Sequence, residues 1–136
     1  MYSPGWAGLL EVMTSPLAAC KAAAETLGFE PQVTFKGPVD TVVPVPMAEQ
    51  LLPTLREALS NAVRHAGASA VTVTVAVDGE DVLLVVADNG KGLPENGRRS
   101  GLANMEQRAT DLGGRFTATN GVGGGAEIAW RVPLRR

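Results

Sequence analysis

One short stretch, EALSNAVRHAG at residues 57 to 67, sets an acid, an amide and the only histidine of the chain at equal intervals. In an α-helix, steps of four residues drift by only about 40° around the axis, so Glu57, Asn61 and His65 should share one flank. A carboxylate and an imidazole can exchange protons, and an amide can bind through its oxygen. A polar flank of a helix is, however, more often simply hydrated.

Two further features follow along the chain. DNGKG, from Asp88 to Gly92, stands where an apolar strand is expected to end. In SGLANM, Gly101 stands just before an expected helix, whose free backbone N–H groups can meet an anion. Taken singly, the first is an ordinary turn and the second a common helix start. Their occurrence together with the polar flank, in this order, favours a functional site.

The composition limits the classes of protein. With 136 residues and 45% apolar residues, we expect one domain and a tail. Twelve Lys and Arg against 14 Asp and Glu provide no basic excess for nucleic acid. Cys20 is the only cysteine and is predicted to be a buried thiol in a reducing compartment. No apolar run is long enough for a membrane span, so a cytoplasmic chain without direct membrane contact is expected.

The periodicities predict the elements that position these residues. Leu51, Leu55, Leu59 and Val63 indicate a helix from about Met47 to His65, with Pro53 in its first turns or at a kink. The other expected elements are a helix from Pro16 to a stop at Gly28, a strand QVTFK, a hairpin at DGED whose second strand is covered on both faces, a loop NGKGLPENGRRSG, a helix LANMEQRATDLGG and a closing hairpin through GVGGG. This order predicts an α+β fold, with a mixed, mostly antiparallel sheet and helices on one face.

Three segments carry a family resemblance: LREALSNAVRHAGASAVTVTV, VVADNGKGL and SGLANMEQRATDLGGRFTATNGVGGGAEIAWRVPL. They resemble the N box and the two Gly boxes of the nucleotide-binding domain shared by histidine kinases, gyrase-type ATPases, Hsp90 and mismatch-repair ATPases. More narrowly, they are similar to the catalytic domain of nitrate-sensor and oxygen/redox-sensor kinases. The resemblance covers about residues 17 to 135 and implies a two-layer α/β sandwich of the Bergerat or GHKL type.

For the phosphate end of the site, the resemblance implies that Asn61 ligates a magnesium ion bridging the triphosphate. Magnesium takes oxygen ligands and few protein ligands besides phosphate oxygens. Glu57 would orient a metal-bound water or assist proton transfer. Arg64 would offset phosphate charge. His65 closes the motif, either through a structural hydrogen bond or at a phosphate.

For the base end, the resemblance implies that Asp88 accepts a hydrogen bond from the adenine amino group, which favours ATP over GTP. Gly90 and Gly92 would allow close approach of the backbone or a positive φ. Leu93 to Ser100 would form a short ATP lid. Gly101 and Leu102 would begin the helix whose N-terminus receives the phosphates.

Within that lid, Arg98 and Arg99 would reach phosphates or a partner domain, or would only be solvated, whereas Lys91 should face solvent. Two positions depart from the family pattern. Ser100 replaces a glycine before Gly101, which is expected to reduce lid flexibility. Ala126 replaces a threonine that helps to hold the adenine-binding aspartate, which is expected to weaken nucleotide binding.

The activity implied is binding of Mg-ATP and transfer of its γ-phosphoryl group to a histidine on a separate dimerisation domain, with a response regulator downstream. The sole histidine lies in the nucleotide motif, so the acceptor histidine is expected on a different domain. Residues 1–16 are then expected to be a linker or a remnant of the connection to that dimerisation domain, and residues 17–136 the catalytic domain. Alone, the catalytic domain would bind ATP with little turnover. The alternatives are a serine kinase of the anti-sigma-factor type, a degenerate non-catalytic module and, more remotely, a gyrase-type clamp.

Overall fold

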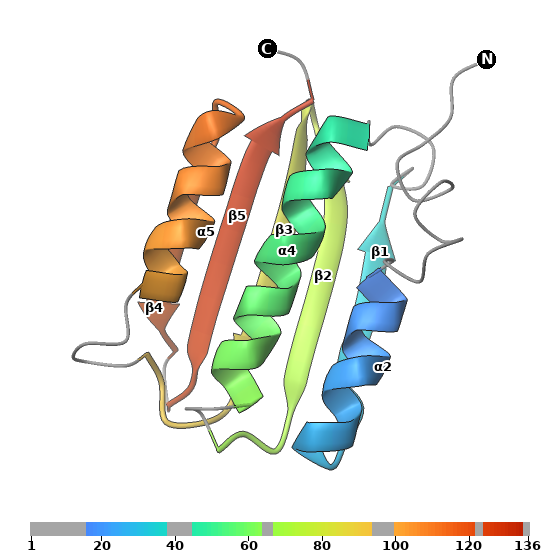
Figure 1. Cartoon of the computed structure of the whole chain (residues 1–136), viewed down its shortest axis with the longest axis vertical. Coiled ribbons are helices and arrows are strands. Elements are labelled where there is room, and N and C mark those ends of the chain that lie inside the picture. Colours follow the sequence, from blue (N-terminus) through green and yellow to red (C-terminus); the bar gives the residue numbers. More distant parts are fainter. Residues whose placement is uncertain (1–15, 38–44, 64–66, 94–99, 122–123, 135–136) are drawn as a thin grey trace.

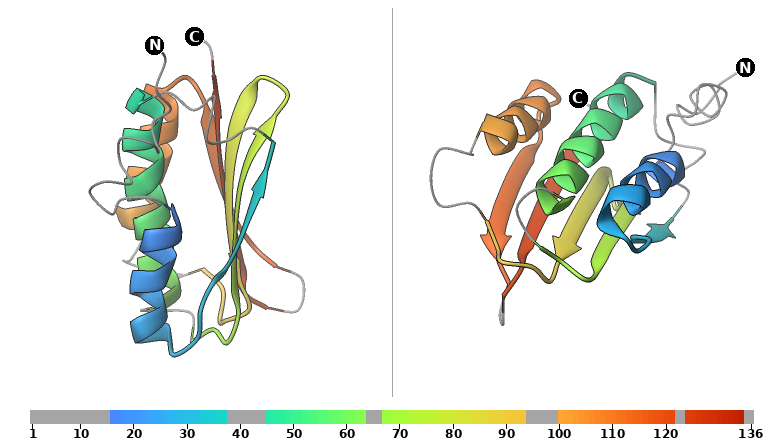
Figure 2. Two further views of the ribbon diagram at one scale, coloured as in Figure 1. Left: turned by 90° about the vertical axis from the view of Figure 1, so that its right-hand side faces the viewer. Right: turned by 60° about the horizontal axis from the view of Figure 1, so that its bottom comes forward.

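The protein is a sheet covered by helices on one face. The computed structural model describes residues 16–37, 45–63, 67–93, 100–121 and 124–134. Their elements, in chain order, are α2 (Pro16–Leu27), β1 (Gln32–Lys36), α4 (Val45–Asn61), β2 (Val71–Asp78), β3 (Asp81–Asp88), α5 (Ser100–Asp111), β4 (Arg115–Asn120) and β5 (Ala126–Pro133). The three helices form one layer and the strands the other (Figures 1 and 2). The predicted α+β sandwich is therefore confirmed.

The sheet is mixed. Its strand order is β1-β2-β3-β5-β4, with β1 parallel to β2 and the other neighbours antiparallel. Both predicted hairpins are present. Gly79, with φ of 65°, makes the tight turn between β2 and β3, a backbone conformation that residues with a Cβ rarely adopt.

The central strand β3 corrects one expectation. Its side chains alternate, with Val82, Leu84 and Val86 buried beneath the helices and Leu83 and Val85 only half-buried on the other face. The described helices, α2, α4 and α5, cover only the first of these faces (Figure 2). The continuous apolar run led to the prediction of cover on both sides, which is wrong because all the described helices pack on a single face.

Helix α4 lies over the middle of the sheet. Leu51, Leu55 and Leu59 are buried, as their spacing predicted. The helix begins at Val45 rather than Met47, and its α-helical part ends at Asn61, after which residues 62 and 63 form a wider π-type turn. Pro53 is inside the helix rather than in its first turn, so the carbonyl four residues earlier receives no hydrogen bond from it.

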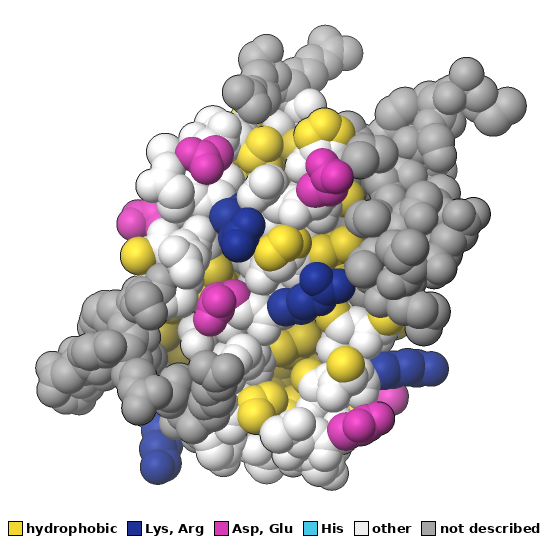
Figure 3. Space-filling view, in the orientation of Figure 1, with side chains coloured by type: hydrophobic (Ala, Val, Ile, Leu, Met, Phe, Trp, Pro, Cys, Tyr) yellow, Lys and Arg dark blue, Asp and Glu magenta, His cyan; other side chains and the backbone are white. Residues whose placement is uncertain are grey.

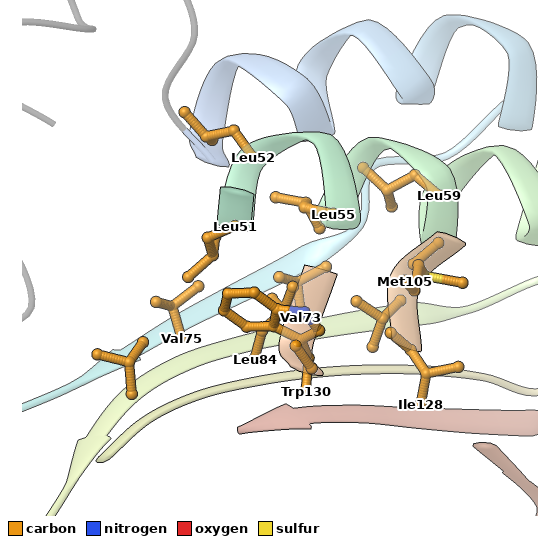
Figure 4. Packing of buried hydrophobic residues seen from close by; sticks show 14 of the residues in the cluster. Leu51, Leu52, Leu55, Leu59, Val73, Val75, Leu84, Met105, Ile128 and Trp130 are labelled. Atoms are coloured by element: carbon orange, nitrogen blue, oxygen red, sulfur yellow. The ribbon is translucent and has the colours of Figure 1, made fainter. Parts of the chain in front are cut away.

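The core fills the space between α4 and the sheet. Trp130 of β5 is fully buried and lies close to Val73 and Leu84, below Leu51 and Leu55 (Figure 4). Among the described residues, the indole Nε1 has no hydrogen-bond partner. Cys20 of α2 is buried as predicted, and burial together with the charge of Glu30 raises the pKa of its thiol to about 11.

On the side covered by helices, acidic and basic side chains are interspersed rather than gathered into one basic field (Figure 3). No helix within the described ranges has both the length and the apolar character needed to cross a membrane.

The chain directions bring several ends together. Helix α4 and strands β3 and β4 end at the same edge of the molecule where α5 and β5 begin, at the bottom of Figure 1. The three features singled out in the sequence therefore meet at one edge of the two layers.

Candidate nucleotide-binding site

At this edge, the side chain of Glu57 of α4 lies close to Gly101 of α5. A Cβ placed on Gly101 would stand 2.7 Å from Oε2 of Glu57 and 3.1 Å from its Cδ. The half-buried carboxylate of Glu57 thus lies directly against the first turn of α5. Gly101 does not adopt a positive φ, so it is the absence of a side chain that permits this contact.

The start of α5 corrects a second boundary. The helix begins at Ser100, so Gly101 is its second residue rather than the residue before it. Leu102 is buried in the core and anchors the helix, whereas the backbone N–H groups of the first turn have no intrahelical partner. Further along, Nη1 of Arg108 donates a hydrogen bond of 3.2 Å to Oε1 of Gln50, which links α5 to α4.

Asn61 is the last residue of α4 and is half-buried, one turn beyond Glu57. Nowhere in the described ranges do three or more His, Cys, Asp or Glu side chains gather into a set able to hold a metal ion. At this edge Asn61 offers an amide oxygen, and oxygen is the donor type that magnesium takes. This donor set fits magnesium, which commonly keeps several waters and takes phosphate oxygens alongside one or two protein groups.

Asp88 is the last residue of β3 and is half-buried. The two-residue alternation of the strand places it on the same face as Val86, beneath the helices. Its Oδ1 accepts a hydrogen bond of 2.8 Å from the N–H of Gly90, which fixes the orientation of the carboxylate. Within the described ranges its Oδ2 receives no hydrogen bond and is available to a ligand donor.

The glycines after Asp88 differ from each other. Gly92 is buried and has φ of 97°, so it provides the positive φ expected of it. Gly90 does not have a positive φ; its N–H instead holds the Asp88 carboxylate. Lys91 is exposed, as predicted, and Leu93 packs partly against the core.

Asn89 has a structural role that the sequence reasoning missed. Its Oδ1 accepts hydrogen bonds from the N–H groups of Ser69 and Ala70 at 2.8 and 2.9 Å, and its Nδ2 donates to Oγ of Ser69 at 2.9 Å. The side chain therefore ties the segment before β2 to the loop after β3. The DNG sequence was interpreted as a turn or as part of a Gly box, and Asn89 was given no role of its own, although asparagine at such a position often bonds to nearby backbone.

Four of the proposed site residues, Arg64, His65, Arg98 and Arg99, lie outside the described residues. Their roles, like those of Glu57, Asn61 and Asp88, remain predictions. The structure does bring Glu57 and Gly101 into contact and places Asn61 and Asp88 at the same edge of the molecule.

Comparison with known proteins identifies the family. Residues 48–136 match the family described as histidine kinase-, DNA gyrase B- and HSP90-like ATPases. The chain belongs to this family. It is 40% identical over 114 residues to the nitrate/nitrite sensor protein NarX of Escherichia coli, a match covering 82% of the chain and 19% of NarX. The chain thus spans about a fifth of the length of that relative.

Solved structures of histidine kinases also match this chain. The ATP-binding domain of PrrB from Mycobacterium tuberculosis matches with 30% sequence identity and a TM-score of 0.64, covering 88% of this chain and 92% of that one. The histidine kinase AdeS of Acinetobacter baumannii matches with a TM-score of 0.74 over 99% of this chain and 68% of that one, but at 16% identity this supports the fold alone. The chain is an ATP-binding catalytic domain of the sensor histidine kinase type.

Proposed function

We propose that this domain binds Mg-ATP at the edge formed by α4, α5 and the end of β3, and transfers the γ-phosphoryl group to a histidine on a separate dimerisation domain. The contact between Glu57 and Gly101 gives the main structural support, because it joins the polar flank of α4 to the N-terminus of α5. Phosphoryl transfer depends chiefly on positioning and on compensation of charge, and this edge offers groups for both.

The phosphates would meet the first turn of α5. That turn contains no acidic residue, and its free N–H groups carry the positive end of the helix dipole. Glu57 is the negative group facing this turn, so nucleotide phosphates approach a carboxylate as well as the helix. Magnesium, when bound, would offset this negative charge and take the amide oxygen of Asn61 as a ligand.

The acceptor side would use Glu57 as the proton acceptor or water-orienting group. Its carboxylate is held against α5 and is only half-buried, so it can reach a nucleophile presented from outside the domain. The attacking nitrogen comes from the acceptor histidine of the dimerisation domain, and the phosphorylated histidine then passes its phosphoryl group to a response regulator. The cytoplasm is the compartment in which we place this reaction.

The base would be selected by Asp88. An ionised carboxylate only accepts hydrogen bonds, so it pairs with the amino group of adenine and repels the carbonyl oxygen of guanine at that position. The hydrogen bond from Gly90 occupies Oδ1 and leaves Oδ2 for the base.

The first test is calorimetric titration of ATP and GTP, each with and without magnesium. The domain should bind ATP, with magnesium dependence, and should discriminate against GTP. Asp88→Ala should abolish binding. Asp81→Ala is the matched control, because Asp81 stands at the opposite end of the same strand, in an ion pair of 2.9 Å with Arg131. Failure of the unaltered domain to bind ATP would instead support a degenerate module.

The second test supplies the dimerisation domain with labelled ATP. An acid-labile phosphohistidine, formed only when this domain is present, is the expected product. An acid-stable phosphoserine on a partner protein would favour the alternative of a serine kinase of the anti-sigma-factor type. Glu57→Gln should lower the transfer rate and also reduce the dependence of ATP binding on magnesium, because one negative charge facing the phosphates is removed.

A further inference from the structure

The hairpin of β4 and β5 packs against the loop that carries Asp88. Gly125 has φ of 83°, and a Cβ on it would overlap the carbonyl oxygen of Asp88 and stand 3.0 Å from Cα of Asn89. Gly124 also approaches this loop, since a Cβ there would stand 3.5 Å from the carbonyl oxygen of Gly90. The backbone of the hairpin turn therefore supports the beginning of the loop.

Asn120, the last residue of β4, holds the other end of the same loop. Its Oδ1 accepts a hydrogen bond of 2.8 Å from the N–H of Leu93. The same oxygen would stand 2.7 Å from a Cβ on Gly92, so it lies close beside the buried, positive-φ glycine. In the register of the sheet, Asn120 pairs with Ala126, which fixes its backbone to β5.

These contacts leave the loop from Asp88 to Leu93 supported at both ends by the hairpin. The hydrogen bond at the Leu93 end is made by a single side chain, 27 residues away along the sequence. Because Asn120 is itself exposed, water can replace that hydrogen bond, and its loss should leave the fold intact. What it would change is the range of conformations open to Gly92 and Leu93, and through them to the Asp88 carboxylate.

We propose that Asn120 is a positioning residue for nucleotide binding: it holds Gly92 and Leu93 against the hairpin and so keeps the loop of Asp88 in the conformation that accepts the base. This inference rests on the proposed function, since it assigns Asn120 to the same nucleotide site. Asn120 contributes to affinity by ordering the loop before the ligand arrives, because a loop already in its bound conformation loses less entropy on binding.

The test compares three variants for binding of Mg-ATP and for exchange of the Leu93 amide hydrogen. Asn120→Ala should weaken ATP binding by about 3- to 10-fold, the range expected for one net hydrogen bond, and should speed exchange at Leu93. Asn120→Asp keeps an acceptor of the same shape. At high ionic strength, which screens the added charge, this variant should bind Mg-ATP with an affinity within about twofold of that of the unaltered domain. Thr119→Ala, a neighbouring exposed position of β4, should change neither quantity.

Separate outcomes decide between the two proposals. If Asn120→Ala speeds exchange at Leu93 yet binds ATP as tightly as the unaltered domain, the positioning role is overturned and the proposed function stands. The same holds if Asn120→Asp binds as weakly as the alanine variant. If the unaltered domain fails to bind ATP, both proposals fall. Thermal unfolding at an unchanged temperature in all three variants would show that weaker binding arises in the loop and not from loss of the fold.

Discussion

Replacing Gly101 by alanine should separate the stability of the domain from its activity. Alanine is favoured over glycine in helices by up to about 1 kcal/mol, and somewhat less in a first turn. The new Cβ would stand 2.7 Å from Oε2 of Glu57, where ordinary contact begins at 3.4 Å, so the carboxylate must withdraw by about 0.7 Å. The obstructing atoms belong to the end of a flexible side chain, which can move without disturbing either helix.

We therefore expect Gly101→Ala to unfold at the same temperature as the unaltered domain or a few degrees higher, at roughly 4 °C per kcal/mol. Phosphoryl transfer should fall by about 10- to 100-fold, because displacing a catalytic group by about 1 Å costs on the order of 10²-fold. The assays are thermal unfolding and transfer of labelled phosphate from ATP to the dimerisation domain.

A double-mutant cycle checks the cause. If alanine at position 101 acts by displacing Glu57, it should cause no further loss of transfer when Glu57 is already alanine. A stable Gly101→Ala variant that transfers at the original rate would refute the reasoning. So would a variant that loses several kcal/mol of stability, because the backbone rather than the Glu57 side chain would then have to give way.

Three further changes test other parts of the molecule. Ala126→Thr should bind ATP a few-fold more tightly, because it adds a hydroxyl next to Gly125, which lies against the backbone of Asp88, and it should lose about 1 kcal/mol of stability because the site is buried; calorimetry and urea unfolding measure the two effects. The folded protein retains the Cys20 thiol proton up to a pKa of about 11, above the ordinary value of 9.0 for a thiol. The stabilisation from the protonated thiol is present below pH 9 and is lost as the pH rises through about 11. Over this range, the free energy of unfolding measured in urea should fall more for the unaltered protein than for Cys20→Ala. Trp130→Phe should cost less than about 2 kcal/mol, because it removes some packing and a buried N–H that has no partner in the part of the chain that the structure describes, whereas Trp130→Ala should cost about 3–5 kcal/mol in the same assay.

Much of the fold follows from local patterns. The leucines at 51, 55 and 59 recur at helical spacing, and the turn at Gly79 joins two β-rich runs, so the helix and the hairpin were both predictable. The error about β3 arose because burial was judged from composition. Leu83 and Val85 extend an apolar run, but nothing in a run of apolar letters tells whether one or both faces of a strand are covered.

In the candidate site, some residues could be recognised from the sequence and others could not. The types and order of Glu57, Asn61 and Asp88 were visible as motifs, and so was Gly101 at the beginning of the last helix. The supporting contacts of Asn89 and Asn120 were not, because each side chain bonds to backbone 19 to 27 residues away and carries no periodic signal. Short-range patterns record which residues share an element but not which elements meet.

The sequence by itself determined the order of the elements, the buried face of α4 and the family of nucleotide-binding domains to which the chain belongs. Only the tertiary structure decided that Glu57 lies against Gly101 and that Asp88 is held by Gly90. It also decided that the last hairpin supports the loop from Asp88 to Leu93. The physical reason is one of range: hydrophobic periodicity reflects burial within one helix or strand, whereas a contact between elements depends on how all of them pack together.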